Sequence, residues 1–288
     1  ETVRKINPKI IYGSVSGLGP KGPDAQEGVF DILGQARGGF MSLLAASVGY
    51  PIHAAQGMSD QTGAIMLAHG ILLAIIARER FGVGQHVQTS QLGSQLTLQA
   101  MTLNAYLLTD EMPRPRFIDR AANPLFNLYK CGDEKWIALG CVQGDRYWGD
   151  ICVVLKIEHF VDDPRFNSMD GRRDNNVELI ALLNDVFSIK GRDEWVLMLR
   201  ERGVLCSPVQ NYDDLLDDPQ VVANEYFTEL EHPVFGTMKE VGVTAQLSET
   251  PGAARSPAPE FGEHTEQVLL TYGYSWEDIA GFRERNVI

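Results

Sequence analysis

A short polar stretch followed by a long apolar run constrains this chain most strongly. Residues 57–63 read Gly-Met-Ser-Asp-Gln-Thr-Gly, and the apolar run 64–77 follows directly. Small polar residues before such a run are a helix start signal, so the sequence predicts a long, largely buried helix that begins near Asp60. His69 and Gly70 interrupt the run, which is too short to span a bilayer and is interpreted as a core helix. Asp60 has two ordinary uses there, as a helix cap or as a nucleophile at the positive end of the helix dipole, and spacing alone favours the cap.

The segments around this helix alternate between strand and helix signals. A β-prone run that we interpret as a buried strand comes first, and a Gly/Pro loop follows it. The predicted elements are a strand at 9–16, a loop at 17–23, a helix at 30–44 interrupted by paired glycines, the Asp60 helix ending near Arg80, a strand at 85–89 and a helix at 90–108. This alternation predicts a doubly wound α/β sheet. Because ligands bind outside the carboxyl ends of strands in such sheets, the Gly/Pro loop is a candidate ligand wall.

The rest of the chain has a different pattern and predicts further domains. Residues 1–108 form the large α/β domain, and the polar, Pro-bearing stretch 109–123 is a linker. Residues 124–208 open with a hairpin signal at 127–140 and continue with three helical patterns, which predicts a smaller α+β domain. Residues 209–288 are expected to form a linker and a C-terminal segment that returns to the large domain.

Composition limits the classes of partner. The chain has 288 residues, a net charge of −13 and a pI of about 4.9, so neither nucleic acid nor an anionic membrane surface is an expected partner. The four cysteines are widely spaced, with no C-x-x-C pair and no histidine cluster at metal-ligand spacing. A reducing cytoplasm therefore fits better than a disulfide framework, and no metal site is expected.

Several motifs along the whole chain resemble those of the class III CoA-transferases, the group of formyl-CoA and carnitine CoA-transferases and α-methylacyl-CoA racemases. The signature at residues 7–17, NPKIIYGSVSG, is the most specific of them. The other matching blocks are GP at 22–23, the D…Q…GGFMS block at 31–42, SDQTG at 59–63, GVGQHV at 82–87, RSPAP at 255–259 and GEHT at 262–265. They occur in family order, and together they make the resemblance specific.

The resemblance implies a fold, an activity and site residues. It implies a partial Rossmann-like large domain and makes Asp60 the covalent nucleophile that moves CoA between an acyl-CoA donor and a carboxylic acid acceptor. Acyl-CoA would be a substrate rather than a tightly bound cofactor, and two chains would form an interlocked homodimer. The family's CoA contacts fall on five positions of this sequence: Gly28, Val29, Phe30, Asp31 and Gln91. No side chain identifies the acyl group or the acceptor acid.

Two alternatives remain open beside the transferase. In the racemase branch a histidine stands at the position of Phe30, and a phenylalanine cannot move a proton, which disfavours a racemase. A non-catalytic CoA-binding subunit is the second alternative, and the retained Asp60 counts against it. The sequence also departs from the family: Val83 replaces an arginine, residues 120–124 do not resemble the family's glycine-rich shielding loop, and the chain enters the pattern just before the Asn7-Pro8 signature. The resemblance thus implies that the family's N-terminal segment, with its first strands and nucleotide contacts, lies outside this sequence.

Overall fold

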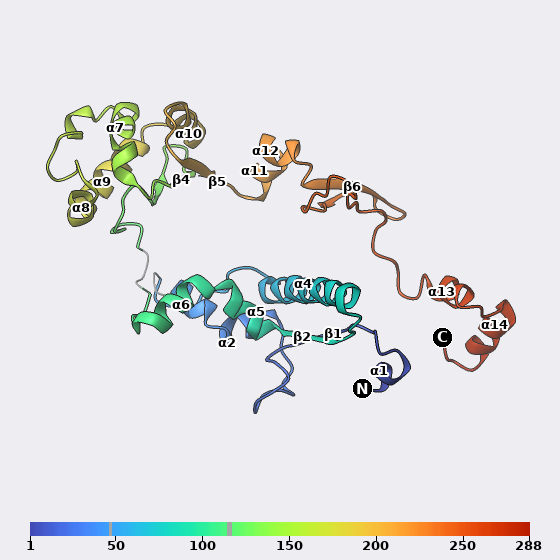
Figure 1. The fold of residues 1–288 in the computed structure, drawn as a ribbon. Helices are drawn as coiled ribbons and strands as arrows, with labels where there is room; N and C mark the ends of the chain where they lie inside the picture. Colours follow the sequence, from blue (N-terminus) through green and yellow to red (C-terminus); the bar gives the residue numbers. More distant parts are fainter. Residues whose placement is uncertain (46–47, 114–116) are drawn as a thin grey trace. The chain divides into compact units, whose positions relative to one another are not determined.

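The structure is a computed structural model, and it describes residues 1–45, 48–113 and 117–288. The chain divides into two compact units, Glu1–Ser207 and Pro208–Ile288. Part of the predicted linker, residues 114–116, lies outside the described residues. Figure 1 shows the elements of each unit.

The first part of the chain has the alternating strands and helices that the sequence predicts. Its elements are α1 (Thr2–Ile6), β1 (Tyr12–Ser16), α2 (Asp31–Arg37), α3 (Phe40–Ala45), α4 (Met58–Phe81), β2 (His86–Ser90), α5 (Gln91–Leu98) and α6 (Ala100–Thr109). Strands β1 and β2 are parallel, with Tyr12 opposite His86 and Ser16 opposite Ser90. Helix α4 packs against both strands and against α2 and α5. The mixed α/β class is therefore confirmed.

Helix α4 begins where the sequence predicts but is not largely buried. Only Ser59, Gly63 and Ala74 are buried, while Ile65 and Leu72 are 65% and 59% exposed. The prediction of a buried core helix is therefore wrong for the described part of the chain. The physical reason is that apolar residues lie all round the helix, whereas its described neighbours cover one side. Strand β1 was also expected to be buried, and its Tyr12 and Val15 are instead exposed.

The length of α4 corrects a second expectation. The helix has 24 residues, so by length and composition it could cross a membrane, although the apolar run inside it was judged too short. Length and composition are weak criteria, because the core helix of a soluble protein meets them as well. In α4 only 11% of the most apolar window is buried.

The predicted helix at 90–108 is in fact two helices, α5 and α6. The break is at Gln99, whose φ of −95° and ψ of 7° are not helical. Its side-chain amide donates to the carbonyl oxygens of Gly38 and Gln95, at 2.9 Å each. The paired glycines between α2 and α3 include a close approach, because a Cβ on Gly38 would lie 2.6 Å from the Cβ of Gln95.

A small sheet and a set of helices build the well-packed part of the first unit. The elements are β3 (Leu128–Lys130), β4 (Trp136–Leu139), α7 (Gly144–Leu155), the 3-10 helix Glu158–Phe160, α8 (Met169–Asp174), α9 (Asn176–Phe187), α10 (Arg192–Glu201) and β5 (Cys206–Val209). The strand order is β3-β4-β5, and β3 and β4 form the predicted antiparallel hairpin. Phe187 packs between Tyr129 and Trp195, with ring centroids 5.0 and 5.5 Å away. The buried Arg172 donates to the Phe166 carbonyl at 2.6 Å.

The second unit contains short helices and one hairpin. Its elements are α11 (Tyr212–Leu216), α12 (Pro219–Ala223), β6 (Phe227–His232), β7 (Gly236–Val241), α13 (Thr265–Thr271) and α14 (Trp276–Glu284). Strands β6 and β7 are antiparallel, and β7 ends at Val241. Helix α14 starts with a capping box that Ser275 and Asp278 form.

Candidate active site

The site lies at the carboxyl ends of the two parallel strands. Helix α5 starts directly after β2, and the side chain of Ser90 caps it by accepting the N–H of Gly93 at 3.0 Å. The N–H of Leu92 donates to the carbonyl of Gly17, at the end of β1, at 3.0 Å. The start of α5 is therefore held against both strands, at the edge where ligands bind in open α/β sheets.

Asp60 lies in the first turn of α4 and is exposed. The residue before the helix is Gly57, in the left-handed region with a φ of 76°, and it makes no side-chain cap hydrogen bond. Asp60 does not cap the helix either: its Oδ1 accepts a hydrogen bond from Nε2 of Gln91. The capping role that spacing alone favoured for Asp60 is thus wrong, because another carboxylate fills it.

That other carboxylate belongs to Asp31, at the start of α2. Its Oδ1 accepts the backbone N–H of Ser59 at 2.6 Å, and the N–H of Gly57 also donates to this carboxylate. Its Oδ2 accepts hydrogen bonds from Gln35 at 2.9 Å and from Nε2 of His53 at 3.0 Å. Asp31 therefore fixes the beginning of α4 from a neighbouring helix.

The environment of Asp31 favours its ionised form. Burial by itself raises the pKa of this carboxyl, but the hydrogen bonds from His53, Ser59, Gly57 and Gln35 outweigh burial and lower the pKa below its ordinary value. The carboxylate also lies at the N-termini of both α2 and α4, where helix dipoles stabilise negative charge. Asp31 is therefore an anion that hydrogen bonds from other residues of this chain hold in place.

Three helix starts meet closely because α2 carries a glycine at the contact. A Cβ on Gly34 would lie 2.3 Å from the Oγ of Ser59 and 3.3 Å from the Cβ of Gln91. Ser59 is fully buried, and Gly63 lies 3.9 Å, measured from an ideal Cβ, from Cγ of Gln91. A larger residue at position 34 would thus separate α2 from the helices that carry Asp60 and Gln91.

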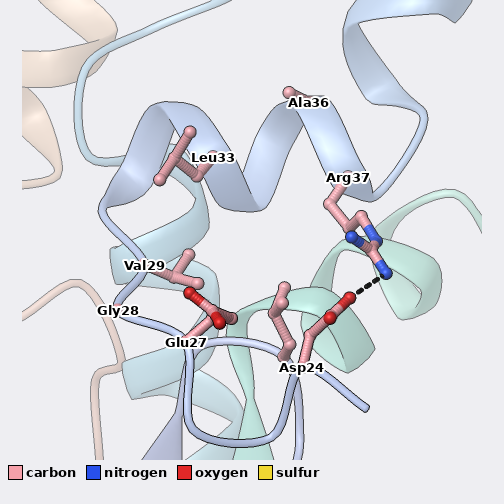
Figure 2. A pocket seen from close by; sticks show the side chains of 8 residues that line it. Asp24, Glu27, Gly28, Val29, Leu33, Ala36 and Arg37 are labelled. Atoms are coloured by element: carbon pink, nitrogen blue, oxygen red, sulfur yellow. Dashed lines mark hydrogen bonds and ion pairs between the residues drawn. The ribbon is translucent and has the colours of Figure 1, made fainter. Parts of the chain in front are cut away.

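A pocket of about 530 Å³ lies on the other side of α2. Its walls are formed by Leu18, Asp24, Glu27, Gly28, Val29, Leu33, Ala36 and Arg37. Figure 2 shows Arg37 of α2 paired with Asp24 of the preceding loop, and Nη2 of Arg37 lies 2.6 Å from Oδ2 of Asp24. The pocket is mainly apolar and contains a guanidinium group that is 58% exposed.

The structure separates the five predicted CoA contacts into three groups. Gly28 and Val29 line the pocket. Phe30 precedes α2 and is 80% exposed. Asp31 and Gln91 are both turned to the start of α4.

Sequence reasoning missed two residues that support the site. His53 lies in a loop, and its ring contacts Asp31. Gln35 donates to Asp31 and also to the carbonyl of Ala55 at 2.8 Å. The spacing of Asp31 and Gln35, four residues apart on a helix, was the one available signal. Within the three described ranges, no group of three or more His, Cys, Asp or Glu side chains is placed to hold a metal ion.

Comparison with known families and proteins gives one consistent picture. The family model described as CoA-transferase family III matches residues 1–265. The (R)-2-hydroxy-4-methylpentanoate CoA-transferase of Clostridioides difficile is 29% identical over 296 residues, which cover 100% of this chain and 72% of the relative. The human succinyl-CoA:glutarate CoA-transferase is 24% identical, over 93% of this chain and 61% of the relative. This chain therefore spans about three fifths to three quarters of the length of these relatives.

Solved structures show the same fold. A CAIB/BAIF family protein from Brucella suis matches with a TM-score of 0.82 and 23% identity, over 94% of this chain and 70% of that one. The crystal structure of Rv3272 from Mycobacterium tuberculosis matches with a TM-score of 0.79, also at 23% identity, over 92% of this chain and 70% of that one.

Proposed function

The chain belongs to CoA-transferase family III, and from this membership we propose that it moves CoA from an acyl-CoA donor to a carboxylic acid acceptor, with Asp60 as the covalent nucleophile. The observation that carries the proposal is the position of Asp60. Its carboxylate is exposed in the first turn of α4, at the carboxyl edge of the sheet. It does not cap the helix, because Asp31 accepts the N–H of Ser59 instead. A thioester can therefore reach an oxygen of this carboxylate.

The proposed reaction exchanges one acyl bond at each step. A carboxylate oxygen of Asp60 attacks the thioester carbonyl and the C–S bond breaks. CoA departs as its thiolate, and the acyl group remains on Asp60 as a mixed anhydride. The thiolate then attacks Cγ of Asp60 and expels the donor acid as its carboxylate, which leaves an aspartyl-CoA thioester. The acceptor carboxylate attacks the same Cγ and expels the thiolate, and the thiolate finally takes the new acyl group and frees Asp60. The thioester energy is conserved because every intermediate is an activated acyl compound.

The start of α4 supports this chemistry electrostatically. The helix dipole stabilises negative charge on a first-turn carboxylate and on the oxyanions that form there. Asp31 fixes this helix start, so the position of Asp60 is set by a hydrogen-bonded cluster rather than by a loose loop.

We further propose that the pocket beside Gly28 and Val29 receives part of the CoA molecule. Its apolar wall fits the pantetheine arm, while Arg37 is paired with Asp24 of the same lining. An interlocked homodimer and a cytoplasmic location belong to the same proposal. The exposed apolar side chains of α4 support the first, and the four free cysteines support the second.

The mechanism is tested by trapping the intermediate. The protein is incubated with an acyl-CoA, quenched with hydroxylamine, and digested for mass spectrometry, with Asp60→Asn as the matched control. We expect a hydroxamate on the peptide that contains Asp60 and none in the variant. Modification of another carboxylate in an active enzyme would refute the mechanism. An α-methylacyl-CoA in D₂O tests the racemase alternative, since deuterium uptake at the α-carbon without an acceptor acid would contradict a transferase.

A further inference from the structure

We propose that Gln91 is a catalytic residue of this reaction: its side-chain amide holds Oδ1 of Asp60 and stabilises the negative charge that forms on that oxygen. The inference rests on the proposed function. It departs from the CoA contact that the family resemblance implies for this position. The observation that carries it is the hydrogen bond from Nε2 of Gln91 to Oδ1 of Asp60, between residues 31 positions apart in the chain.

Gln91 is fixed by the backbone around it. It is the first residue of α5, immediately after β2, and its neighbours Ser90 and Leu92 are both hydrogen bonded, to Gly93 and to Gly17. The glycine at position 34 of α2 lets the helix pass close to the Gln91 side chain. A group on regular elements with close neighbours keeps its position during a reaction better than one on a loop.

The chemistry of the two groups determines which way the amide faces. An ionised carboxylate only accepts hydrogen bonds, so the NH₂ end of Gln91 must face Asp60, and the reverse orientation would bring two acceptors together. Oε1 of Gln91 is buried and has no hydrogen-bond partner among the residues that the structure describes. Among the described residues, the side chain of Gln91 therefore makes its polar contact with Oδ1 of Asp60, and this contact leaves Oδ2 of Asp60 to attack.

The same hydrogen bond assists two of the four proposed steps. After the first step Oδ2 bears the acyl group, and Oδ1 is a carbonyl oxygen. When CoA thiolate attacks Cγ, the C–O π electrons move to Oδ1, and this oxyanion collapses again as the donor carboxylate leaves. Attack of the acceptor carboxylate on the aspartyl-CoA thioester creates the oxyanion a second time. Gln91 donates to it in both steps without transferring a proton, as a donor of an oxyanion hole does.

The test compares Gln91→Leu and Gln91→Glu with the wild type. Removing one oxyanion donor lowers kcat by about 10²- to 10³-fold in known cases, and we expect a fall of this size with KM for acyl-CoA changed by less than about threefold. Gln88→Leu is the matched control, because Gln88 is exposed on β2, three residues earlier, and should leave kcat unchanged. Thermal unfolding of each variant checks that the fold is retained, and Gln91→Glu keeps the size of the side chain if Gln91→Leu does not fold.

A second readout does not depend on turnover. The side-chain amide resonances of Gln91, assigned by their loss in Gln91→Leu, should shift in Asp60→Asn, because the charged acceptor is gone. No shift would overturn the contact. A raised KM with unchanged kcat would assign Gln91 to CoA binding and overturn its catalytic role, as would unchanged kinetics. A wild-type protein that exchanges no CoA would refute the proposed function itself, whereas exchange that survives in Gln91→Leu refutes the role of Gln91 alone.

Discussion

Replacing Asp31 with asparagine should loosen the start of α4 and so disturb the position of Asp60. The substitution keeps the size of the side chain but removes its charge and one acceptor. In the variant, Oδ1 can still accept the N–H of Ser59. The new NH₂ group, however, faces the donors of Gln35 and His53, which in the wild type bind Oδ2 at 2.9 and 3.0 Å. Gln35 is fully buried and already donates to Ala55, so it cannot turn its amide without losing that bond.

The magnitude follows from these contacts. A hydrogen bond to a charged group contributes about 1.5–3 kcal/mol and a neutral one about 0.5–1.5, so weakening the Ser59 bond removes about 1 kcal/mol. The disrupted contacts at Oδ2 add at least a similar amount, which brings the total to about 2 kcal/mol. Since 1.36 kcal/mol is a factor of ten, the helix start should open about 30-fold more often.

Hydrogen–deuterium exchange of the Ser59 amide measures this opening. We expect exchange about 30-fold faster in Asp31→Asn, together with slower labelling of Asp60 by acyl-CoA. Asp119→Asn is the control, because that carboxylate is 67% exposed and pairs with its neighbour Arg120, an interaction of little energetic weight. Exchange within twofold of the wild type would show that Asp31 does not hold α4, and the reasoning about the site would be wrong.

The pH dependence has a definite sign. The pKa of Asp31 is lowered in the folded protein, so its contribution to stability is fully present above the ordinary value of 3.8. The contribution is lost as the pH falls through the lowered pKa. Protection of the Ser59 amide should therefore decrease in acid for the wild type, and the part due to Asp31 should be missing from Asp31→Asn.

Three further outcomes are expected. Gly34→Ala places a Cβ 2.3 Å from the Oγ of Ser59, so overpacking between two helices should destabilise the protein by about 1–3 kcal/mol and lower its Tm; an unchanged melting curve contradicts the close approach. Arg172→Met removes the buried guanidinium in the small α+β region and leaves the Phe166 carbonyl unpaired, so the free energy of unfolding in urea should fall by about 2 kcal/mol. A fall of less than about 0.5 kcal/mol would contradict this role of Arg172. Burial raises the pKa of Cys131 to about 11 and of Cys152 to about 12, so at pH 8 both thiols should react with a disulfide reagent far more slowly than in denaturant, and equal rates refute their burial.

The sequence predicts local features of the fold well. The start of α4 follows from the polar stretch before its apolar run, and the capping box at Ser275 follows from the acidic residues after it. The β3–β4 hairpin also follows from its turn, in which Glu134 takes a left-handed φ of 64°. Each of these signals acts over a few residues, so it can be read from the sequence alone.

The contacts that define the site act over longer distances. Asp31 caps α4 from 28 residues away, and Gln91 meets Asp60 from 31 residues away. Periodicity does not specify such pairs, which is why spacing assigned the cap to Asp60. The break at Gln99 is similar, since the Gln99 side chain donates to the carbonyl of Gly38, which follows α2, 61 residues away in the chain. The exposure of α4 was missed because composition records how apolar a helix is and not what covers it.

Helix α2 separates the pocket from the helix starts that carry Asp60 and Gln91 by its periodicity. One face carries Asp31, Gly34 and Gln35, which contact the starts of α4 and α5. Positions 33, 36 and 37 lie on the other face and line the pocket. Residues three or four apart share a helix face, which separates the two sets. Both sets belong to one helix, so neither set can shift without the other. A ligand that moved α2 on the pocket side would therefore move the carboxylate that holds α4, and with it Asp60. Of these positions the resemblance placed Asp31 at CoA, whereas the geometry gives α2 two tasks, to line a pocket and to hold the start of α4, which carries Asp60.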